Sequence, residues 1–252
     1  MTTMRTLWAS LLFTLSVLVP RAALAEDPCR TVDFEDIPFT VCEAKATDDV
    51  RLWLKSGDAP IGSPARVQDV LKPGERLVFA MNAGMFEADR SPVGLYVEDG
   101  QEIAPLVTRS SGGNFSLTPN GVLCIGTPDG GTGFSIFETS EYAARRPACR
   151  YATQSGPMLV LGGELHPRFL ADSDSVYIRN GVGVSADGQT AWFAISDKPV
   201  NFHRFARFFR DALGARDALY FDGSISRLAV PGEGRNDFGF PVGPIVGMVA
   251  HD

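Results

Sequence analysis

The stretch LYFDGSIS, residues 219–226, begins as an apolar run and ends in a carboxylate, a glycine and two hydroxyls. A short apolar run that stops abruptly at such residues is typical of a buried β-strand that enters a loop. The glycine allows a sharp turn of the backbone there. Binding and catalytic side chains often lie on loops that a rigid scaffold positions. The stretch therefore predicts a strand that delivers Asp222 to a functional loop.

Two other segments have the same construction. RLVFA (76–80) runs into MNAGMF (81–86), and the polar cluster ATQSGP (152–157) runs into MLVL (158–161). Each apolar segment is bordered by a short polar cluster that contains glycine. Three such borders predict that the clusters converge on one site.

Most of the remaining chain is typical of β-hairpins. Strands over 176–184 and 190–195 flank Asp187-Gly188, and strands over 114–118 and 122–125 flank Asn120-Gly121. Asp-Gly and Asn-Gly between apolar runs are strong hairpin signals, and the Asn-Gly turn is the stronger of the two. The sequence thus favours sheets built from neighbours along the chain.

Three helices are expected, and one of them is a short helix near 140–146. Ser63 and Pro64 indicate a helix that runs to about Leu71, with the serine as its N-cap. Asn201 indicates a second helix from 202 to 213, which Gly214 ends. The fold class expected is α+β: a mostly antiparallel or mixed β-sheet packed by a few helices, in a single compact domain.

The first residues indicate an export signal. Arg5 precedes an apolar run from Leu7 to Val19, which is too short to span a bilayer as a helix. Ala23-Leu24-Ala25 then forms an A-x-A cleavage site. We expect a signal peptide over 1–25, a mature domain over 26–252, and a periplasmic or secreted protein; an uncleaved N-terminal anchor is the alternative. No membrane insertion is expected after cleavage.

The charge of the chain limits its partners. The formal net charge is −7, and removal of Arg5 and Arg21 with the signal peptide takes it to −9. A surface of this sign repels nucleic acid and anionic lipid. No nucleic-acid partner is therefore expected, and any phosphate has to be held by local groups.

The chain has four cysteines, and all four lie after residue 25. An even number of cysteines in an exported chain predicts two disulfides, for which three pairings are possible. We favour the pairing that is local in sequence, Cys29–Cys42 and Cys124–Cys149. There is no C-x-x-C pair and no H-x-x-x-H or H-x-E pattern, so neither a metal site nor another cofactor is expected.

Three side chains are the strongest catalytic candidates. Asp222, at a strand end with apolar neighbours, could serve as a general acid or base, or it could be a turn aspartate that bonds its own backbone. Arg179 precedes Asn180-Gly181 and could fork onto a phosphate or carboxylate, or it could be a surface arginine beside a turn. Asn82, followed closely by Gly84, could meet a ligand, or it could belong to a plain turn.

The cluster at 154–156 supplies further candidates. Gln154 and Ser155 offer an amide and a hydroxyl, and Gly156 precedes a proline in a restricted turn. The alternative is again a structural turn. Ser155 does not lie in a G-x-S-x-G frame, which disfavours the nucleophile of a hydrolase elbow.

Taken together and in order, these clusters resemble the phosphodiester glycosidase family, and most of all its exported bacterial members. The matching stretches are MNAGMF (81–86), NGVLCIG (120–126), ATQSGPMLV (152–160), RNGVGV (179–184) and ALYFDGSIS (218–226), the last preceded by the helix NFHRFARFFRDALGA (201–215). They extend over roughly residues 76–250. Each motif is weak alone, but the ordered set is specific.

The resemblance implies a hydrolase that cleaves a sugar-1-phosphodiester at the anomeric carbon, releasing the sugar and leaving a phosphomonoester. Arg179, with Asn82 or backbone N–H groups, would hold the phosphate, and Asp222 would activate water or stabilise an oxocarbenium-like centre. The residues expected to bind substrate are Gly84, Gln154, Ser155, Gly156, Asn180, Gly223 and Ser224, of which Gln154, Ser155 and Ser224 would bond sugar hydroxyls.

Two questions stay open from the residues alone. The second carboxylate could be Asp197, Asp174 or Glu87. The protein could also be a non-catalytic periplasmic or surface protein that binds glycans or exopolysaccharide. A deep pocket around Asp222 would favour the enzyme, and a shallow groove lined by Trp53, Trp192 or tyrosines would favour the binding protein.

Overall fold

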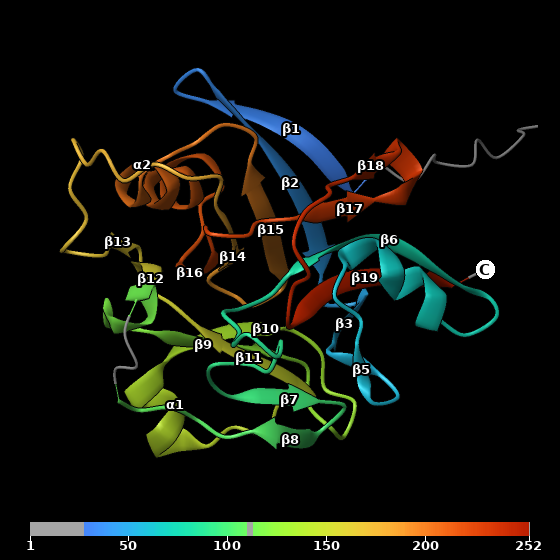
Figure 1. Cartoon of the computed structure of the whole chain (residues 1–252). Coiled ribbons are helices and arrows are strands. Elements are labelled where there is room, and N and C mark those ends of the chain that lie inside the picture. Colours follow the sequence, from blue (N-terminus) through green and yellow to red (C-terminus); the bar gives the residue numbers. More distant parts are fainter. Residues whose placement is uncertain (1–27, 110–112, 252) are drawn as a thin grey trace, which may run out of the picture.

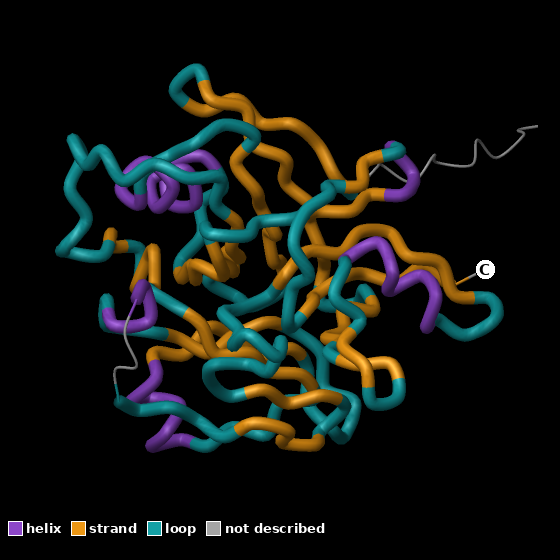
Figure 2. Tube along the Cα trace, in the orientation of Figure 1, coloured by secondary structure: helices purple, strands orange, loops and turns teal. Residues whose placement is uncertain are grey.

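Three antiparallel β-sheets form the body of the molecule in the computed structural model, which describes residues 28–109 and 113–251. In Figure 1 the sheet that contains β7 and β8 lies at the bottom, and the sheet that contains β6 and β19 lies at the right. Figure 2 shows that helices occupy the periphery and that strands make the interior. Every strand pair among the described residues is antiparallel, which agrees with the expected α+β class.

The order of strands within each sheet differs from their order along the chain. The seven-stranded sheet consists, from edge to edge, of β1 (Cys29–Phe34), β2 (Ile37–Lys45), β15 (Thr190–Ser196), β14 (Asn180–Val184), β16 (Asp217–Asp222), β12 (Met158–Leu161) and β13 (Glu164–Leu165). The first five-stranded sheet consists of β10 (Phe134–Glu138), β9 (Gly121–Ile125), β11 (Tyr151–Ser155), β7 (Tyr96–Glu98) and β8 (Gln101–Ala104). The second consists of β18 (Arg235–Asn236), β17 (Leu228–Val230), β6 (Glu75–Asn82), β19 (Ile245–His251) and β3 (Asp49–Trp53). A small hairpin pairs β4 (Lys55–Ser56) with β5 (Ala59–Pro60).

Short helices connect these strands. The α-helices are α1 (Thr139–Arg145) and α2 (Phe202–Arg207), and α2 continues as a π-helical segment, η3 (Phe208–Ala212). The 3-10 helices are η1 (Pro64–Val70), η2 (Gly113–Ser116) and η4 (Pro231–Glu233). The helix predicted from Asn201 is confirmed, because the Asn201 side chain accepts a hydrogen bond from the Arg204 amide at 2.9 Å.

One hydrophobic core joins all three sheets. Met81 of β6, Leu123 of β9 and Val182 of β14 belong to the same buried cluster, although each lies in a different sheet. A second cluster packs α2 and η3 onto the seven-stranded sheet, where the rings of Phe39 and Phe208 stack with centroids 3.9 Å apart. The shared core fixes the sheets relative to one another, so residues at strand ends in different sheets keep defined distances.

The hairpin predicted over 176–195 is confirmed over residues 180–195. β14 pairs with β15 from Asn180 opposite Ile195 to Val184 opposite Ala191. Gly188 in the connecting turn has φ +69°, which suits glycine. The first strand is shorter than predicted, because β14 begins only at Asn180.

The hairpin predicted over 114–125 is wrong. The segment before the Asn-Gly pair contains the 3-10 helix η2, and β9 pairs instead with β10 and β11. The reason is that the Asn120 side chain is buried and donates a hydrogen bond to the Phe115 carbonyl at 2.7 Å. Asn120-Gly121 therefore opens a strand and does not turn a hairpin.

The helix predicted from Ser63 is also different in kind. η1 is a 3-10 helix, and Ser63 makes no side-chain capping bond. The serine hydroxyl instead accepts a hydrogen bond from Nη2 of Arg227 at 3.1 Å. A contact distant in sequence has replaced the expected local cap.

Both predicted disulfides are confirmed. Cys29 pairs with Cys42 across the β1–β2 hairpin, and Cys124 of β9 pairs with Cys149 just before β11. Bonded cysteines of this kind are typical of chains that fold in an oxidising compartment. The predicted signal peptide falls on residues 1–25, which lie outside the described residues.

Removal of the second disulfide is expected to destabilise the fold. The Cys124–Cys149 bridge closes a segment with a sequence separation of 25 residues. On the loop-entropy model, a Cys124→Ser, Cys149→Ser variant should lose about 3 kcal/mol of the free energy of unfolding. Denaturant unfolding measures this, with the wild type under reducing conditions as the companion sample. An unchanged midpoint would contradict the prediction.

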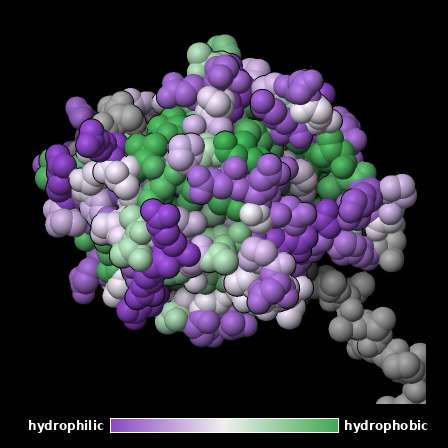
Figure 3. Space-filling model, turned by 90° about the horizontal axis from the view of Figure 1, so that it is seen from below, coloured by the Kyte–Doolittle hydropathy of each residue, from purple (hydrophilic) through white to green (hydrophobic). Residues whose placement is uncertain are grey.

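The described part of the chain contains no helix that is long and apolar enough to cross a bilayer. Figure 3 shows one face of the molecule, on which apolar residues form several patches separated by polar residues. Over the same described ranges, no cluster of three or more His, Cys, Asp or Glu residues could hold a metal ion.

Candidate active site

Asp222 ends β16 and lies in a tight turn with the next residues. Its Oδ1 accepts hydrogen bonds from the amides of Gly223 at 2.6 Å and Ser224 at 2.8 Å. Burial of the carboxyl raises its pKa above the ordinary value, although the amides of Ser224, Gly223 and Ile225 work in the opposite direction. The turn aspartate expected as an alternative is therefore present, and burial also gives this carboxylate an unusual affinity for a proton.

Gly223 allows this turn to press against two other side chains. A Cβ atom at this position would lie 2.0 Å from the Tyr220 hydroxyl and 3.3 Å from Nη1 of Arg179. Tyr220 is fully buried and has little room to retreat. The Asp222 turn thus rests directly on Tyr220 and Arg179.

Arg179 is buried, with 1 % of its surface exposed, so the interpretation of a surface arginine is wrong. The guanidinium carbon lies 3.8 Å from the ring centroid of Phe202, 5.3 Å from that of Tyr177 and 5.4 Å from that of Tyr220. Cation–π contacts of this kind hold a guanidinium in place within an aromatic enclosure.

The hydrogen bonds of Arg179 leave its charge uncompensated. Nε donates to the Val200 carbonyl at 2.8 Å, Nη1 to the Tyr220 hydroxyl at 3.2 Å and Nη2 to the Ser175 carbonyl at 3.0 Å. All three acceptors are neutral, and no ion pair of Arg179 occurs within residues 28–109 and 113–251. Burial lowers the pKa of the guanidinium from its ordinary value, as expected for a desolvated cation. A guanidinium has more N–H groups than these three bonds use, so Arg179 retains donors that these three acceptors do not occupy.

Asn82 and Asn180 tie the Asp222 loop to two sheets. Nδ2 of Asn180 donates to the Asn82 carbonyl at 2.7 Å and to Asn82 Oδ1 at 3.1 Å. Nδ2 of Asn82 donates to the Ile225 carbonyl at 2.7 Å, and the Asp222 amide donates to Asn180 Oδ1 at 3.1 Å. Both asparagines are fully buried. The side-chain amides of Asn82 and Asn180 therefore anchor the Asp222 loop to β6 and β14.

Two serines complete this support. Ser226 Oγ lies 2.8 Å from the Asp222 carbonyl and 3.0 Å from the Ile178 carbonyl. Ser155 Oγ donates to the Phe221 carbonyl at 3.0 Å. The structure thus brings Asn82, Ser155, Asn180, Gly223 and Ser224 together with Asp222 and Arg179. Ser224 is the exposed member of this group.

Gln154, Gly156 and Gly84 lie against residues that do not belong to the Asp222 turn. Gln154 Oε1 accepts from the amides of Leu95 and Val107 at 3.0 Å each, so this buried side chain connects loops of the β7–β11 sheet. A Cβ at Gly156 would lie 2.0 Å from Asn120 Oδ1, and one at Gly84 would lie 3.0 Å from Thr153 Oγ1. No hydrogen bond among the described residues joins Gln154 to the Asp222 turn.

Tyr220, Ser226 and Arg227 belong to the same network and were not among the sequence candidates. Tyr220 is itself a core residue within the buried run 218–221 of β16, so it carries no signal of its own. Ser226 follows the DGS motif closely, so the second hydroxyl of LYFDGSIS could have indicated it. The Arg227 amide donates to Asn82 Oδ1 at 2.9 Å, a contact between residues that are distant in the sequence.

The two tryptophans that would have lined a shallow glycan groove make contacts elsewhere, whereas Tyr177 is 51 % exposed. Trp53 is buried in the core beside η1 and β19. Trp192 donates from Nε1 to Glu43 at 3.0 Å. Asp197, one candidate for the second carboxylate, accepts from Thr40 at 2.9 Å and from Arg235 at 2.9 Å.

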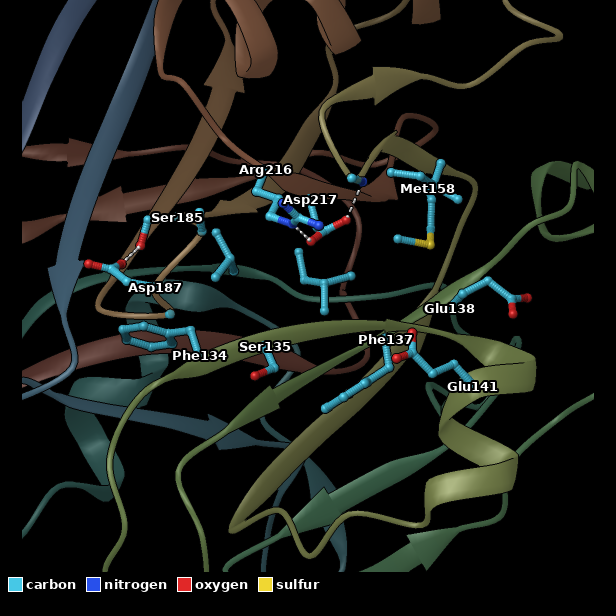
Figure 4. A pocket seen from close by; sticks show the side chains of 16 residues that line it. Phe134, Ser135, Phe137, Glu138, Glu141, Met158, Ser185, Asp187, Arg216 and Asp217 are labelled. Carbon is cyan, nitrogen blue, oxygen red and sulfur yellow. Dashed lines mark hydrogen bonds and ion pairs between the residues drawn. The ribbon is translucent and has the colours of Figure 1, made fainter.

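A separate cavity of about 480 Å³ lies between β10 and the β14–β15 turn (Figure 4). Ser185 and Asp187 bond to each other on one side of it, and Arg216 and Asp217 pair on another. Asp217 also accepts from the Gly162 amide at 2.7 Å. Asp222, Arg179 and Asn82 do not line this cavity.

Comparisons with known proteins agree with the ordered motifs. The family model described as phosphodiester glycosidase matches residues 75–244. The "Uncharacterized protein YigE" of Escherichia coli K12 is 33% identical over 228 residues, which cover 88% of this chain and 85% of that protein.

Solved structures show the same fold at low identity. The catalytic domain of zebrafish N-acetylglucosamine-1-phosphodiester alpha-N-acetylglucosaminidase, auto-inhibited by its pro-peptide, superposes with a TM-score of 0.60 at 15% identity, covering 89% of this chain and 81% of that one. A hypothetical protein from Synechocystis gives a TM-score of 0.56 at 15% identity, covering 88% of this chain and 61% of that one.

Proposed function

The chain belongs to the phosphodiester glycosidase family, and from this premise we propose that it hydrolyses a sugar-1-phosphodiester. Water attacks the anomeric carbon, and the bond from that carbon to the phosphate oxygen breaks. The sugar leaves with the hydroxyl of water, and the acceptor keeps a phosphomonoester. The two disulfides favour a periplasmic or secreted site of action.

One observation carries the proposal: a buried guanidinium with only neutral hydrogen-bond acceptors rests against the turn of a partly buried carboxylate. Arg179 Nη1 lies beside the backbone of Gly223, next to Asp222. Burial of a cation without a counterion is costly. An anionic phosphodiester would supply the missing charge.

The roles follow from these environments. Arg179 binds the phosphate and stabilises the charge that grows on it as the bond to carbon breaks, an effect that is strongest in a site with little water. Asp222 takes the proton of the attacking water or faces the positive charge on the sugar ring. The phosphate is already a good leaving group, so protonation of the leaving oxygen matters less.

The two asparagines act through the loop. The hydrogen bonds of their side-chain amides go to protein atoms, so we assign Asn82 and Asn180 as positioning residues for Asp222. Ser155 positions the strand end in the same manner. Ser224, which is exposed beside Asp222, is the member of the cluster best placed to bond a sugar hydroxyl.

Hydrolysis of a panel of sugar-1-phosphodiesters tests the proposal. The panel contains UDP-GlcNAc, a diester of GlcNAc-1-phosphate and the matching glucose compounds. The expected result is release of free sugar together with a phosphomonoester, and the Asp222→Asn variant serves as the negative control. Tight binding of sugars by both proteins without release from any donor would instead indicate a glycan-binding protein.

The pH dependence of turnover should report Asp222. Burial raises its pKa above the ordinary value of 3.8, and the proposed role needs the ionised form. The value of kcat/KM should therefore fall on acidification, with a midpoint above 3.8. A raised pKa lowers stability only as pH rises through the range between the unfolded and folded pKa values, so protonation of Asp222 does not itself unfold the protein. Rate profiles recorded with circular dichroism separate the two effects; a flat acidic limb would contradict the role.

A further inference from the structure

A second region of the molecule concentrates positive charge. A cavity of about 480 Å³ there is lined by Gly62, Ser63, Arg66, Arg90, Arg227 and Pro241, together with their neighbours in the chain. The three arginines are the charged members of this lining. Arg227 directly precedes β17, which pairs with β6, and β6 pairs in turn with β19 (Figure 1). The net charge of the whole chain is −7, so a cavity lined by three arginines has a local charge opposite in sign to that of the protein.

Arg227 provides a fixed charge at this cavity. Its side chain is buried and donates to the carbonyl of Asp237 at 2.7 Å, to that of Phe240 at 3.1 Å and to the Ser63 hydroxyl at 3.1 Å. These acceptors are neutral. The Asp237 carboxylate lies near enough to favour the charge on Arg227, but its oxygens accept from Arg235 and from the Leu228 amide. Arg227 thus contributes positive electrostatic potential to the cavity, while its own N–H groups are hydrogen-bonded to protein atoms.

Arg66 and Arg90 supply donors that a ligand could use. Arg66 makes a long bond to the Ile61 carbonyl at 3.4 Å and a loose ion pair with Asp69 at 3.7 Å, in which both side chains are about two-thirds exposed. Arg90 lies with its guanidinium carbon 5.3 Å from the Phe86 ring centroid. Over the described ranges Arg90 has no ion pair. Exposed pairs such as Arg66–Asp69 contribute little, so a phosphate can compete for that guanidinium.

The size of the cavity favours an organic anion over a single ion. Small-molecule sites measure about 300–1,000 Å³, and this cavity falls within that range. The loop at its edge carries Phe238 and Phe240, which are 88 % and 74 % exposed. We propose that this cavity binds the phosphate group of a phosphomonoester, with Arg66 and Arg90 as its donors and Arg227 as its fixed charge. Arg227 connects this cavity to the Asp222 network, because its backbone amide donates to Asn82 Oδ1 at 2.9 Å. Occupancy of the cavity does not require the proposed hydrolysis.

Equilibrium binding to the mature, disulfide-bonded protein tests this site. Glucose 6-phosphate, inorganic phosphate and glucose are titrated by calorimetry into the wild type and into an Arg66→Gln, Arg90→Gln variant. The control is Arg76→Gln, Arg168→Gln, which removes the same charge from two exposed arginines outside the cavity. Asp222→Asn is included to separate this site from the proposed catalytic one.

The expected result is saturable binding of glucose 6-phosphate that the cavity variant weakens by about tenfold or more. The control variant and Asp222→Asn should bind as the wild type does. Binding of inorganic phosphate with the same variant dependence would assign recognition to the oxyanion itself. The proposal is overturned if glucose 6-phosphate does not bind, if glucose binds equally well, or if both double variants weaken binding to the same extent.

Discussion

Asp222→Asn is expected to abolish turnover of a sugar-1-phosphodiester and to leave the fold intact. Asparagine has the same shape, and its Oδ1 can keep the hydrogen bonds from Gly223 and Ser224. What it lacks is the negative charge and the ability to take a proton. General acid–base catalysis contributes about 10²–10⁴-fold, so a loss of this order in kcat is expected.

The melting temperature of this variant should stay at the wild-type value or rise slightly, because substitution removes a carboxylate whose burial is unfavourable. The matched control is Asp217→Asn at the other end of the same strand, where the carboxylate accepts from the Gly162 amide. It should keep wild-type turnover. Retained activity in Asp222→Asn, with the control also active, would remove Asp222 from the mechanism.

Arg179→Met should produce the second large effect. Methionine can fill the space between the Phe202 and Tyr220 rings, while the charge and the forked donors disappear. Removal of one preorganised charge-stabilising group costs about 10²–10³-fold, and kcat/KM should fall by this much. Replacement of a buried ion by a well-packed apolar residue is often neutral or stabilising, so the melting temperature should change little.

Two further variants serve as comparisons for Arg179→Met. Arg179→Lys keeps the charge but loses the planar fork, so its kcat/KM should lie between those of the wild type and Arg179→Met. Arg204→Met removes an exposed arginine of α2 that pairs with Glu35, and it should leave turnover unchanged. If Arg179→Met hydrolyses the substrate at the wild-type rate, Arg179 has only a structural role.

The sequence indicated local structure well and tertiary contacts poorly. The β14–β15 hairpin and the Asn201 cap depend on neighbours in the chain, and both are confirmed. Asn120-Gly121 carried a still stronger local signal that proved wrong, because the Asn120 side chain is buried against Phe115. Ser63 shows the same effect, since its hydroxyl accepts from Arg227 and makes no capping bond.

For the candidate site too, the sequence indicated the local structure but not the contacts between distant residues. Apolar runs that end in polar clusters indicated the loop of Asp222 and the strands that hold it. The burial of Arg179 within aromatic rings could not be foreseen, because Phe202 and Tyr220 come from different elements. Gln154 was expected to meet a sugar, yet its bonds go to the loops at Leu95 and Val107. An amide two residues before a glycine has the same sequence signature whether it binds a ligand or the protein's own backbone.

Asn82 and Asn180, which together hold the Asp222 loop, make the candidate site depend on residues that are far apart in the chain. Asn82 reaches Ile225 across 143 residues and is itself reached by Asn180 across 98 residues. Contacts of such long range require the closure of a long intervening chain, which costs conformational entropy. A nascent or truncated polypeptide can therefore bury much of its core and still lack a competent active centre.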